Sequence, residues 1–527
     1  MEKLTKIAAC LAGLVILIAV ATGCHEREQA KVGETEYLEE ITIKQLQQGY
    51  REGKFTVAQV VNDYLTRIEE LDKNGPVLNS IIAINPEAIR IAQELDSELA
   101  AGKSRGPLHG IPVILKDNIE SKDSMPTTAG AVVLKNSYVW RDSHVAKKLR
   151  EAGAVIIAKA NLSEWANFRA SLSSSGWSGV GGQTRNPYDT ERNPCGSSSG
   201  SGVAVAANLC AFAIGTETNG SIVCPSNNNG IVGLKPTVGL ISRTGIIPIS
   251  FTQDTPGPMA RTVEDVAVCL GIMVGVDSTD AKTLNPDAVF YSDYSKFLKR
   301  DGLKGKRIGL LTNVSGFHFK VDTLMKQSVD AMKQAGAEVV AIDFPVSREV
   351  DNASFEVLLY EFKDGLNRYF ASLGESARVK NISELIKFNL NDSVELMYFD
   401  QQLLEMAQSK GDLNSPEYKK NLEMMQTGMR KQGIDRIMND YKLDALVAPT
   451  GSPAWKTDLV DGDHFLGGSS SYAAIAGYPS ISVPMGFIDG LPVNISFIGK
   501  AWSEAELLSI AYSYEQATHQ RKKPMLE

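Results

Sequence analysis

The chain has 527 residues, of which 43% are hydrophobic and 22% are charged, a composition typical of a globular protein. Its formal net charge of −8 argues against a nucleic-acid-binding protein, which would carry basic patches. The length allows roughly two to four domains, but no Pro/Ser-rich linker, long run of charge or repeat divides the interior of the sequence. We therefore expect one large domain.

The first 24 residues are typical of an export signal. Two lysines precede an apolar run over residues 8–21, which is shorter than the about 20 residues of a membrane span and ends in small residues. The end of this segment, V-A-T-G-C, resembles a bacterial lipobox. We therefore expect Cys24 to become the lipidated first residue of the mature protein. A plain signal peptide with an unmodified Cys24 is the alternative.

On this interpretation, residues 1–24 are a lipoprotein-type signal peptide and residues 25–40 are a polar tether. The protein would be exported and held by its lipid anchor in the cell envelope, on the periplasmic or outer-membrane side. The sequence does not indicate which membrane leaflet holds it.

From residue 41 to 522, amphipathic helices alternate with short apolar strands. A 3.6-residue period predicts the first helix at Thr56–Leu71, where Thr56 and Gln59 match the sequence of a capping box. Further helices are expected at Pro86–Ala101, His144–Ala152, Val321–Ala335 and Glu504–Thr518. Strands are expected at Ile81–Ile84, Ile111–Leu115, Val155–Ala158, Ala211–Gly215, Arg307–Leu311, Val339–Ile342, Ala445–Ala448, Ser480–Val483 and Val493–Phe497.

This alternation predicts a single large α/β domain with a mixed, largely parallel β-sheet core covered by helices on both faces. Residues 350–440 are mostly polar with a helical pattern. They predict a mainly helical insertion that packs on the sheet and could cover a site.

The four cysteines within the domain give no signal for a metal site. Cys195, Cys210, Cys224 and Cys269 lack the close C-x-x-C spacing of a zinc site. An exported chain can form disulfides, but the sequence does not assign any pair. Buried free thiols are therefore the default expectation.

A Ser- and Gly-rich stretch, N-P-C-G-S-S-S-G-S-G, occupies residues 193–202. It leads into an apolar helix and strand and then a second small-residue turn at Thr218–Ser221, which argues against a flexible linker. The P-loop pattern G-x-x-x-x-G-K-[ST] is absent. Two such turns can face each other across a pocket, one of them presenting a nucleophile among backbone N–H donors. A nucleophile elbow centred on Ser198, with a histidine as base, stays open as an alternative.

Lys116 ends the apolar strand in G-I-P-V-I-L-K-D-N-I. A lysine at the tip of a buried strand needs partners or loses its proton, and a lysine whose pKa is lowered by burial can act as the base for a serine. Snorkelling to solvent is the commoner fate of such a lysine. Its position alone does not decide between the two.

Four stretches of the sequence match one family in order and spacing: G-I-P-V-I-L-K-D-N-I, R-N-P-C-G-S-S-S-G-S-G, G-T-E-T-N-G-S-I and G-I-V-G-L-K-P-T-V-G. The segment D-T-P-G-P-M-A-R-T-V-E-D, residues 254–265, also fits. On these motifs the chain resembles the amidase signature family of serine hydrolases over about residues 40–520. The resemblance implies the amidase signature fold and a Ser–cis-Ser–Lys triad. In that triad Ser221 is the nucleophile, Ser197 is the bridging serine after a cis peptide bond, and Lys116 is the base.

The resemblance also implies roles for residues around the triad. The expected oxyanion hole consists of the backbone N–H groups of Thr218, Asn219, Gly220 and Ser221. Ser198 is expected to support the triad by hydrogen bonding. Glu217, which precedes the turn, is expected either to support the triad by a hydrogen bond or simply to satisfy buried backbone groups. Ser173 and Ser174 lie where relatives contact substrate, although an ordinary polar loop explains them equally well. The resemblance requires neither a metal nor a cofactor.

The activity implied is hydrolysis of carboxamide C–N bonds through an acyl-enzyme, with release of ammonia or an amine. K-A-N-L-S-E-W-A-N-F-R and T-E-T-N-G-S-I-V-C-P are most similar to bacterial peptide amidases, which act on C-terminal peptide amides. Asn219 and Val223 replace the family's common Gly and Arg, so no single relative's substrate transfers directly.

Three alternatives to this interpretation stay open. The first is an amidotransferase A-type subunit that depends on a partner, which an export signal disfavours. The second is an aryl or fatty amide hydrolase. The third is a catalytically inactive binding protein of the cell envelope. Such a protein would not need Lys116, Ser197 and Ser221, all of which are present. The expected partners are a peptide or small-molecule amide and a membrane, not nucleic acid, and the sequence does not indicate an oligomeric state.

Overall fold

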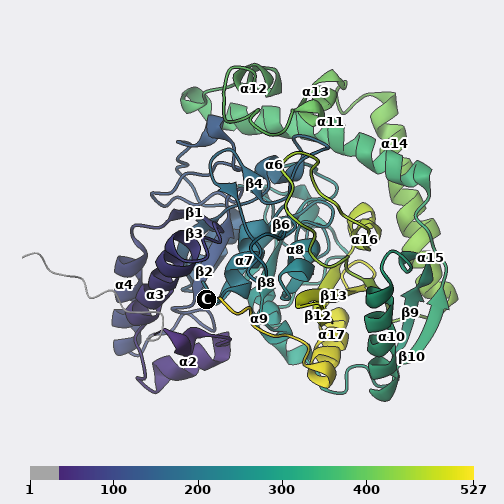
Figure 1. Ribbon diagram of the computed structural model, residues 1–527, viewed down its shortest axis with the longest axis horizontal. Helices are drawn as coiled ribbons and strands as arrows, with labels where there is room; N and C mark the ends of the chain where they lie inside the picture. Colours follow the sequence, from purple (N-terminus) through teal and green to yellow (C-terminus); the bar gives the residue numbers. More distant parts are fainter. Residues whose placement is uncertain (1–34, 527) are drawn as a thin grey trace, which may run out of the picture.

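The computed structural model describes residues 35–526 and has one mixed sheet at its centre (Figure 1). This sheet has 11 strands in the order β1-β3-β2-β6-β8-β7-β12-β13-β11-β9-β10. In chain order its strands are β1 Ile81–Ile84, β2 Pro112–Lys116, β3 Val155–Ala160, β6 Phe212–Glu217, β7 Val232–Lys235, β8 Thr255–Ala260, β9 Arg307–Leu311, β10 Glu338–Ile342, β11 Ala445–Pro449, β12 Ser480–Ile488 and β13 Leu491–Ile498. A separate pair joins β4 Trp177–Ser178 and β5 Gly182–Gln183.

The pairing of the strands confirms an α/β fold built on a mixed sheet. Parallel pairs join β3, β2 and β6 toward one end and β11, β9 and β10 at the other. Antiparallel pairs connect the strands between them and attach β1 at the edge. The central strands β7 and β8 were not expected from the sequence. Pro256 and Pro258 of β8 cannot donate to a ladder, so prolines normally argue against a central strand.

Helices pack against the sheet in two groups, and within each group neighbouring helices contact one another. One group, α7 (Ser199–Ala206) and α8 (Val223–Asn228), contacts β6, β7, β8 and β12. The other group packs against several of the same strands and consists of α5 (His144–Glu151), α9 (Val263–Met273), α10 (Phe319–Gln334) and α17 (Glu504–Thr518). The α-helices are α2 Ile43–Arg51, α3 Val57–Arg67, α4 Ala88–Ala100, α5 His144–Glu151, α6 Glu164–Asn167, α7 Ser199–Ala206, α8 Val223–Asn228, α9 Val263–Met273, α10 Phe319–Gln334, α11 Arg348–Ser372, α12 Ile382–Asn389, α13 Gln402–Ser409, α14 Pro416–Met429, α15 Asp435–Asp440, α16 Ser470–Ala476 and α17 Glu504–Thr518.

The predicted helix at Thr56–Leu71 is α3, which continues as a π-helical segment over Ile68–Asn74. Thr56 caps it by accepting a hydrogen bond from the backbone of Gln59 at 3.1 Å. A complete capping box, with bonds in both directions, forms at Thr42 and Gln45 of α2.

Helices α11 to α15 curve around the upper and right-hand rim of the molecule in Figure 1. The buried face of α11 contributes Phe362 and Phe370 to an apolar cluster that also contains Trp165 and Ile249. The rings of Trp165 and Phe370 meet edge to face at 6.1 Å. This helical layer therefore packs on loops that border the candidate site described below.

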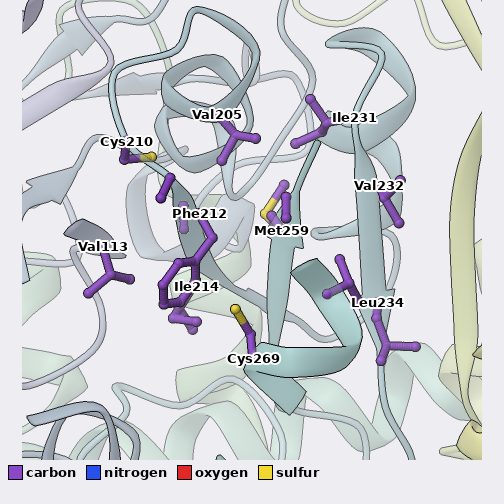
Figure 2. Close-up of a cluster of buried hydrophobic side chains, with 14 of the residues drawn as sticks. Val113, Val205, Cys210, Phe212, Ile214, Ile231, Val232, Leu234, Met259 and Cys269 are labelled. Carbon is purple, nitrogen blue, oxygen red and sulfur yellow. The ribbon is translucent and has the colours of Figure 1, made fainter. Parts of the chain in front are cut away.

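The main apolar core lies between the sheet and its helices. Figure 2 shows Val113 of β2, Phe212 and Ile214 of β6 and Met259 of β8 pointing into it, together with Cys210 and Cys269. Both cysteines are free and fully buried, as expected. Burial raises the pKa of the Cys210 thiol to about 12, so this residue behaves as a small apolar side chain.

The expectation of free thiols is wrong for the other two cysteines of the domain. Cys195 and Cys224 form a disulfide, with their Cα atoms 5.9 Å apart across a sequence separation of 29. The pair forms because the start of α8 folds back beside the turn that precedes α7. This proximity arises only in the tertiary structure, so the spacing of the cysteines does not reveal it.

The predicted signal peptide and lipidation site at Cys24 lie outside the described residues. The end of the predicted tether is not a free linker: Glu36–Leu38 form a 3-10 turn, Leu38 is fully buried, and Glu40 pairs with Arg521 at 2.7 Å. Burial of Leu38 and this ion pair hold the segment against the domain. Between residues 35 and 526, no helix combines the length and apolarity needed to cross a membrane.

Candidate active site

Lys116 lies at the end of β2, where its side chain is fully buried. Because β2 and β6 are parallel neighbours, their carboxyl ends meet at one edge of the sheet, and Lys116 reaches Thr216 of β6. The Lys116 Nζ atom is 2.8 Å from the hydroxyl of Ser197, 2.8 Å from that of Thr216 and 3.1 Å from the Thr216 carbonyl oxygen. The Lys116 ammonium group is therefore buried and does not reach solvent, which rules out the snorkelling alternative.

Burial lowers the pKa of Lys116 to about 7, while the nearby charges of Asp254 and Glu217 raise it in part. A neutral amine is therefore well populated near neutral pH. A neutral amine at hydrogen-bond distance from a hydroxyl can accept its proton.

The stretch at 193–202 positions Ser197 through close backbone packing. The peptide bond between Gly196 and Ser197 is cis, as the family resemblance implied. In the α7 helix that follows, a Cβ atom on Gly200 would overlap the carbonyl oxygens of Ser80 and Asn161. The small residues therefore let this helix start directly against the residues that precede β1 and follow β3, and they fix the turn that carries Ser197.

Ser198 connects the elements of the site. Its hydroxyl donates to the Thr216 carbonyl at 3.1 Å and accepts from the Thr216 N–H at 3.2 Å. Its backbone N–H donates to the Ser221 carbonyl at 3.1 Å. This hydroxyl is fully buried and bonded to backbone on β6, which disfavours Ser198 as an elbow nucleophile.

Residues 218–221 form the second turn, between β6 and α8. Gly220 has φ +86°, in the left-handed region that favours glycine. Glu217 accepts hydrogen bonds from the backbone N–H groups of Ile222 at 2.7 Å and Val223 at 3.0 Å, which fixes the exit from the turn. Ser221, 7% exposed, is placed beside the Ser197–Ser198 turn through the bond from Ser198 to its carbonyl.

Asn219, the residue that departs from the family pattern, points to α16. Its side-chain oxygen accepts from the Ser470 hydroxyl at 2.7 Å, and its amide donates to the Ser471 hydroxyl at 3.2 Å. The turn is therefore linked through its side chain to a distant segment of the chain, at a position where the more common glycine could not form such bonds.

Sequence reasoning missed three residues that bond within the site. Thr216 contacts Lys116 as described, and Asn118 donates to the Thr216 hydroxyl at 3.0 Å. Asp254 accepts from the Thr218 hydroxyl at 2.6 Å and from the backbone of Ile249 and Ser250, each at 2.8 Å. Burial raises the pKa of Asp254 to about 6. All three lie inside the matched motifs.

A cavity of about 270 Å³ adjoins this arrangement. Its wall includes Asn118 and Thr216 near the lysine and Thr218 of the second turn. Arg368 and Tyr369 of α11 line its other side. The helical layer of residues 348–440 therefore borders the candidate site.

Ser173 and Ser174 are bonded within the protein. The Ser173 hydroxyl donates to the Ala170 carbonyl at 3.2 Å, and the buried Ser174 hydroxyl accepts from the Asn193 side chain at 3.1 Å. Ser174 thus supports the start of the 193–202 stretch. The predicted contact of these two serines with substrate stays a prediction.

Comparisons with known proteins agree with this geometry. The amidase family model matches residues 59–508. A probable amidase of Arabidopsis thaliana is 38% identical over 522 residues, covering 97% of this chain and 96% of that protein. The A-type subunit of glutamyl-tRNA(Gln) amidotransferase from Thermoanaerobacter pseudethanolicus is 31% identical, covering 92% of this chain and 98% of that protein.

Among solved structures, the native peptide amidase from Stenotrophomonas maltophilia superposes with a TM-score of 0.89 at 47% identity, covering 93% of this chain and 99% of that one. The fold, the matched family model and the curated relative all cover nearly the whole domain. The chain therefore belongs to the amidase signature family of amide-hydrolysing enzymes, in which it resembles peptide amidase.

Proposed function

We propose that this protein is an exported amidase that hydrolyses carboxamides through a Ser–cis-Ser–Lys triad and releases ammonia or an amine. The substrates proposed are C-terminal amides of peptides or small amides. The observation that carries the proposal is the fully buried Lys116, 2.8 Å from the Ser197 hydroxyl, with a pKa lowered by burial to about 7. Burial also lowers the pKa of Lys235, to about 8, but Lys235 donates only to the carbonyl oxygens of Pro236 and Tyr478, whereas Lys116 contacts a serine hydroxyl.

The first half of the reaction forms an acyl-enzyme. Neutral Lys116 takes the proton of Ser197 while Ser197 takes that of Ser221, whose Oγ atom attacks the amide carbonyl. The protons then pass back along the same chain to the leaving nitrogen, because an amide anion would be a poor leaving group. Cleavage of the C–N bond releases ammonia or an amine and leaves an ester on Ser221. Water repeats the sequence and releases the acid.

The oxyanion formed in each half-reaction is stabilised by the backbone N–H groups of the second turn. These are the N–H groups of Thr218, Asn219, Gly220 and Ser221. Glu217 supports the proposal because its carboxylate holds the residues directly after the turn. Ser198 does so from the other side, through its bonds to Thr216 and Ser221.

Similarity to a peptide amidase over nearly the whole domain favours peptide amides as substrates. From the export signal predicted for residues 1–24, with lipidation at Cys24, we propose that the reaction takes place in the cell envelope. The Cys195–Cys224 disulfide supports export, since disulfides persist mainly in oxidising compartments. A partner-dependent amidotransferase role has support only from relatives such as the glutamyl-tRNA(Gln) amidotransferase protein, whose name gives a different substrate.

The test is ammonia release by the purified chain alone from peptide amides, aliphatic amides, anilides and glutamine. Ser221→Ala is the inactive variant, and Ser201→Ala is its matched control. The Ser201 hydroxyl is also buried but donates to the Ile214 carbonyl, away from the lysine. Turnover of peptide amides that is lost only in Ser221→Ala supports the proposal. Absence of turnover on every substrate by the folded protein would refute an autonomous amidase.

A further inference from the structure

The Cys195–Cys224 disulfide joins the two segments that carry the candidate serines. Cys195 lies two residues before Ser197, and Cys224 lies three residues after Ser221. The bridge therefore ties the turn that precedes α7 to the first turn of α8. Among the residues that the structure describes, no other disulfide joins the two segments that carry the serines.

Hydrogen bonds also link these segments, and two of them lie at the far end of α8. Asn228 donates to the Asn193 carbonyl at 3.2 Å, and Asn229 donates to the Pro194 carbonyl at 2.9 Å. Near the serines, the bond from the Ser198 N–H to the Ser221 carbonyl at 3.1 Å acts together with the disulfide. Hydrogen bonds open and close thermally, whereas the covalent bridge limits how far the two turns separate.

The backbone at Cys195 transmits this constraint to Ser197. Cys195 has φ +57°, an uncommon conformation for a residue with a side chain. Its N–H donates to the Asn193 side chain at 2.8 Å, and its carbonyl accepts from the Ser199 hydroxyl at 2.7 Å. With the sulfur bonded as well, Cys195 is held at three points. A shift there moves the hydroxyl of Ser197 relative to that of Ser221.

We propose that Cys195 and Cys224 are positioning residues of the amidase site, whose disulfide holds the nucleophile turn against the bridging-serine turn. The proposal rests on the function of Lys116, Ser197 and Ser221 given above. Cleavage of the bridge lowers turnover while the domain remains folded. The cysteines themselves contact no reacting atom in this scheme.

The bridge is also the cysteine site of the domain most accessible to a reductant. Cys224 is partly exposed and Cys195 is 5% exposed, whereas Cys210 and Cys269 are fully buried. A dithiol such as dithiothreitol supplies two electrons and two protons. The S–S bond breaks to give two thiols, and the reductant closes to its cyclic disulfide.

The experiment compares the wild-type enzyme with and without dithiothreitol and the double variant Cys195→Ser/Cys224→Ser. A peptide amide is the substrate. We expect kcat to fall by about tenfold to a hundredfold on reduction, because small misplacements of reacting groups have effects of this size. KM changes by less than about threefold, since substrate contacts are retained. The double variant shows the same low kcat and no further response to reductant.

Cys269→Ala is the matched control. It removes a free thiol buried in the main apolar core, so its kcat remains close to wild type and still falls on reduction. Thiol counting verifies cleavage of the bridge, and circular dichroism verifies that the protein remains folded. Loss of kcat that only follows loss of folded protein would overturn the positioning role, as would an unchanged kcat in protein whose bridge is gone.

A separate readout keeps this test apart from the proposed function. The rate at which a fluorophosphonate labels Ser221 reports the reactivity of the nucleophile without an amide substrate. If the oxidised protein hydrolyses no amide, the proposed function fails. The bridge is then judged by labelling alone: slower labelling after reduction supports the positioning role, and an equal rate refutes it.

Discussion

The buried lysine makes the pH dependence of turnover a direct test of the mechanism. With a Lys116 pKa of about 7, half of the lysine is neutral at that pH, and the neutral fraction falls tenfold for each pH unit below it. We expect kcat/KM for a peptide amide to be about a hundredfold lower at pH 5 than on the plateau, which begins near pH 8. Above the plateau, the lysine imposes no further change.

Asp254 has a raised pKa of about 6 and therefore titrates in the same window. The variant Asp254→Asn separates the two groups. The charge of Asp254 raises the pKa of Lys116. If Lys116 controls activity, removal of this charge shifts the acidic limb of the kcat/KM profile, the fall in activity below pH 7, to lower pH but leaves the limb present. If Asp254 itself controlled activity, this acidic limb would disappear.

A matched control for this variant is Asp265→Asn. Burial raises the pKa of Asp265 to about 6 as well, but this residue accepts a hydrogen bond from the Ile43 backbone and is not one of the charges that act on Lys116. Its loss should leave the limb in place. Ammonia release is measured from pH 5 to 9 at constant ionic strength, with folding checked at each pH. A flat profile over this range, in folded enzyme, would contradict a neutral lysine base.

Three further predictions concern single residues. Because the pKa of Lys116 is lower in the folded than in the unfolded protein, its charged form costs folding about 5 kcal/mol below pH 7, a cost that disappears as pH rises toward 10.5. Lys116→Met removes this cost but also loses the bonds to Ser197 and Thr216. We expect no turnover and, by urea denaturation at pH 6, a free energy of unfolding equal to wild type or about 1–3 kcal/mol higher. Glu217→Gln weakens charge-assisted bonds to two backbone N–H groups, so steady-state kinetics should show kcat reduced about tenfold with little change in KM. Gly220→Ala forces a side chain into a left-handed conformation beside Ser470, and thermal denaturation should show a loss of about 1–3 kcal/mol.

The candidate residues that the sequence named and that the structure brings together lie in contiguous motifs. Lys116 follows an apolar strand, and Ser197 and the 218–221 turn lie in stretches of small residues whose packing requirements are local. The apolar runs also located most strands within a few residues, for example Arg307–Leu311 without any change. In these segments the local pattern and the tertiary structure impose the same conformation.

The features that the sequence did not indicate depend on contacts between distant segments. A strand such as T-P-G-P-M-A contains residues that disfavour a central position, and it lies there because its neighbours β6 and β7 pair with it on both sides. The Cys195–Cys224 pair likewise requires α8 to fold back beside the 193–198 turn. Spacing along the chain carries no information on either contact.

Asp254 shows how the two kinds of information combine. Its motif was recognised, but no role followed from the motif, because an aspartate before a proline-rich segment is compatible with an ordinary turn. The antiparallel register of β6 and β8 places Thr255 opposite Glu217. The preceding residue, Asp254, then reaches the hydroxyl of Thr218, the residue after Glu217. The charge that acts on Lys116 therefore follows from one strand register. A motif can identify candidate catalytic side chains, whereas the groups that adjust their pKa values become visible only when the pairing of the strands is known.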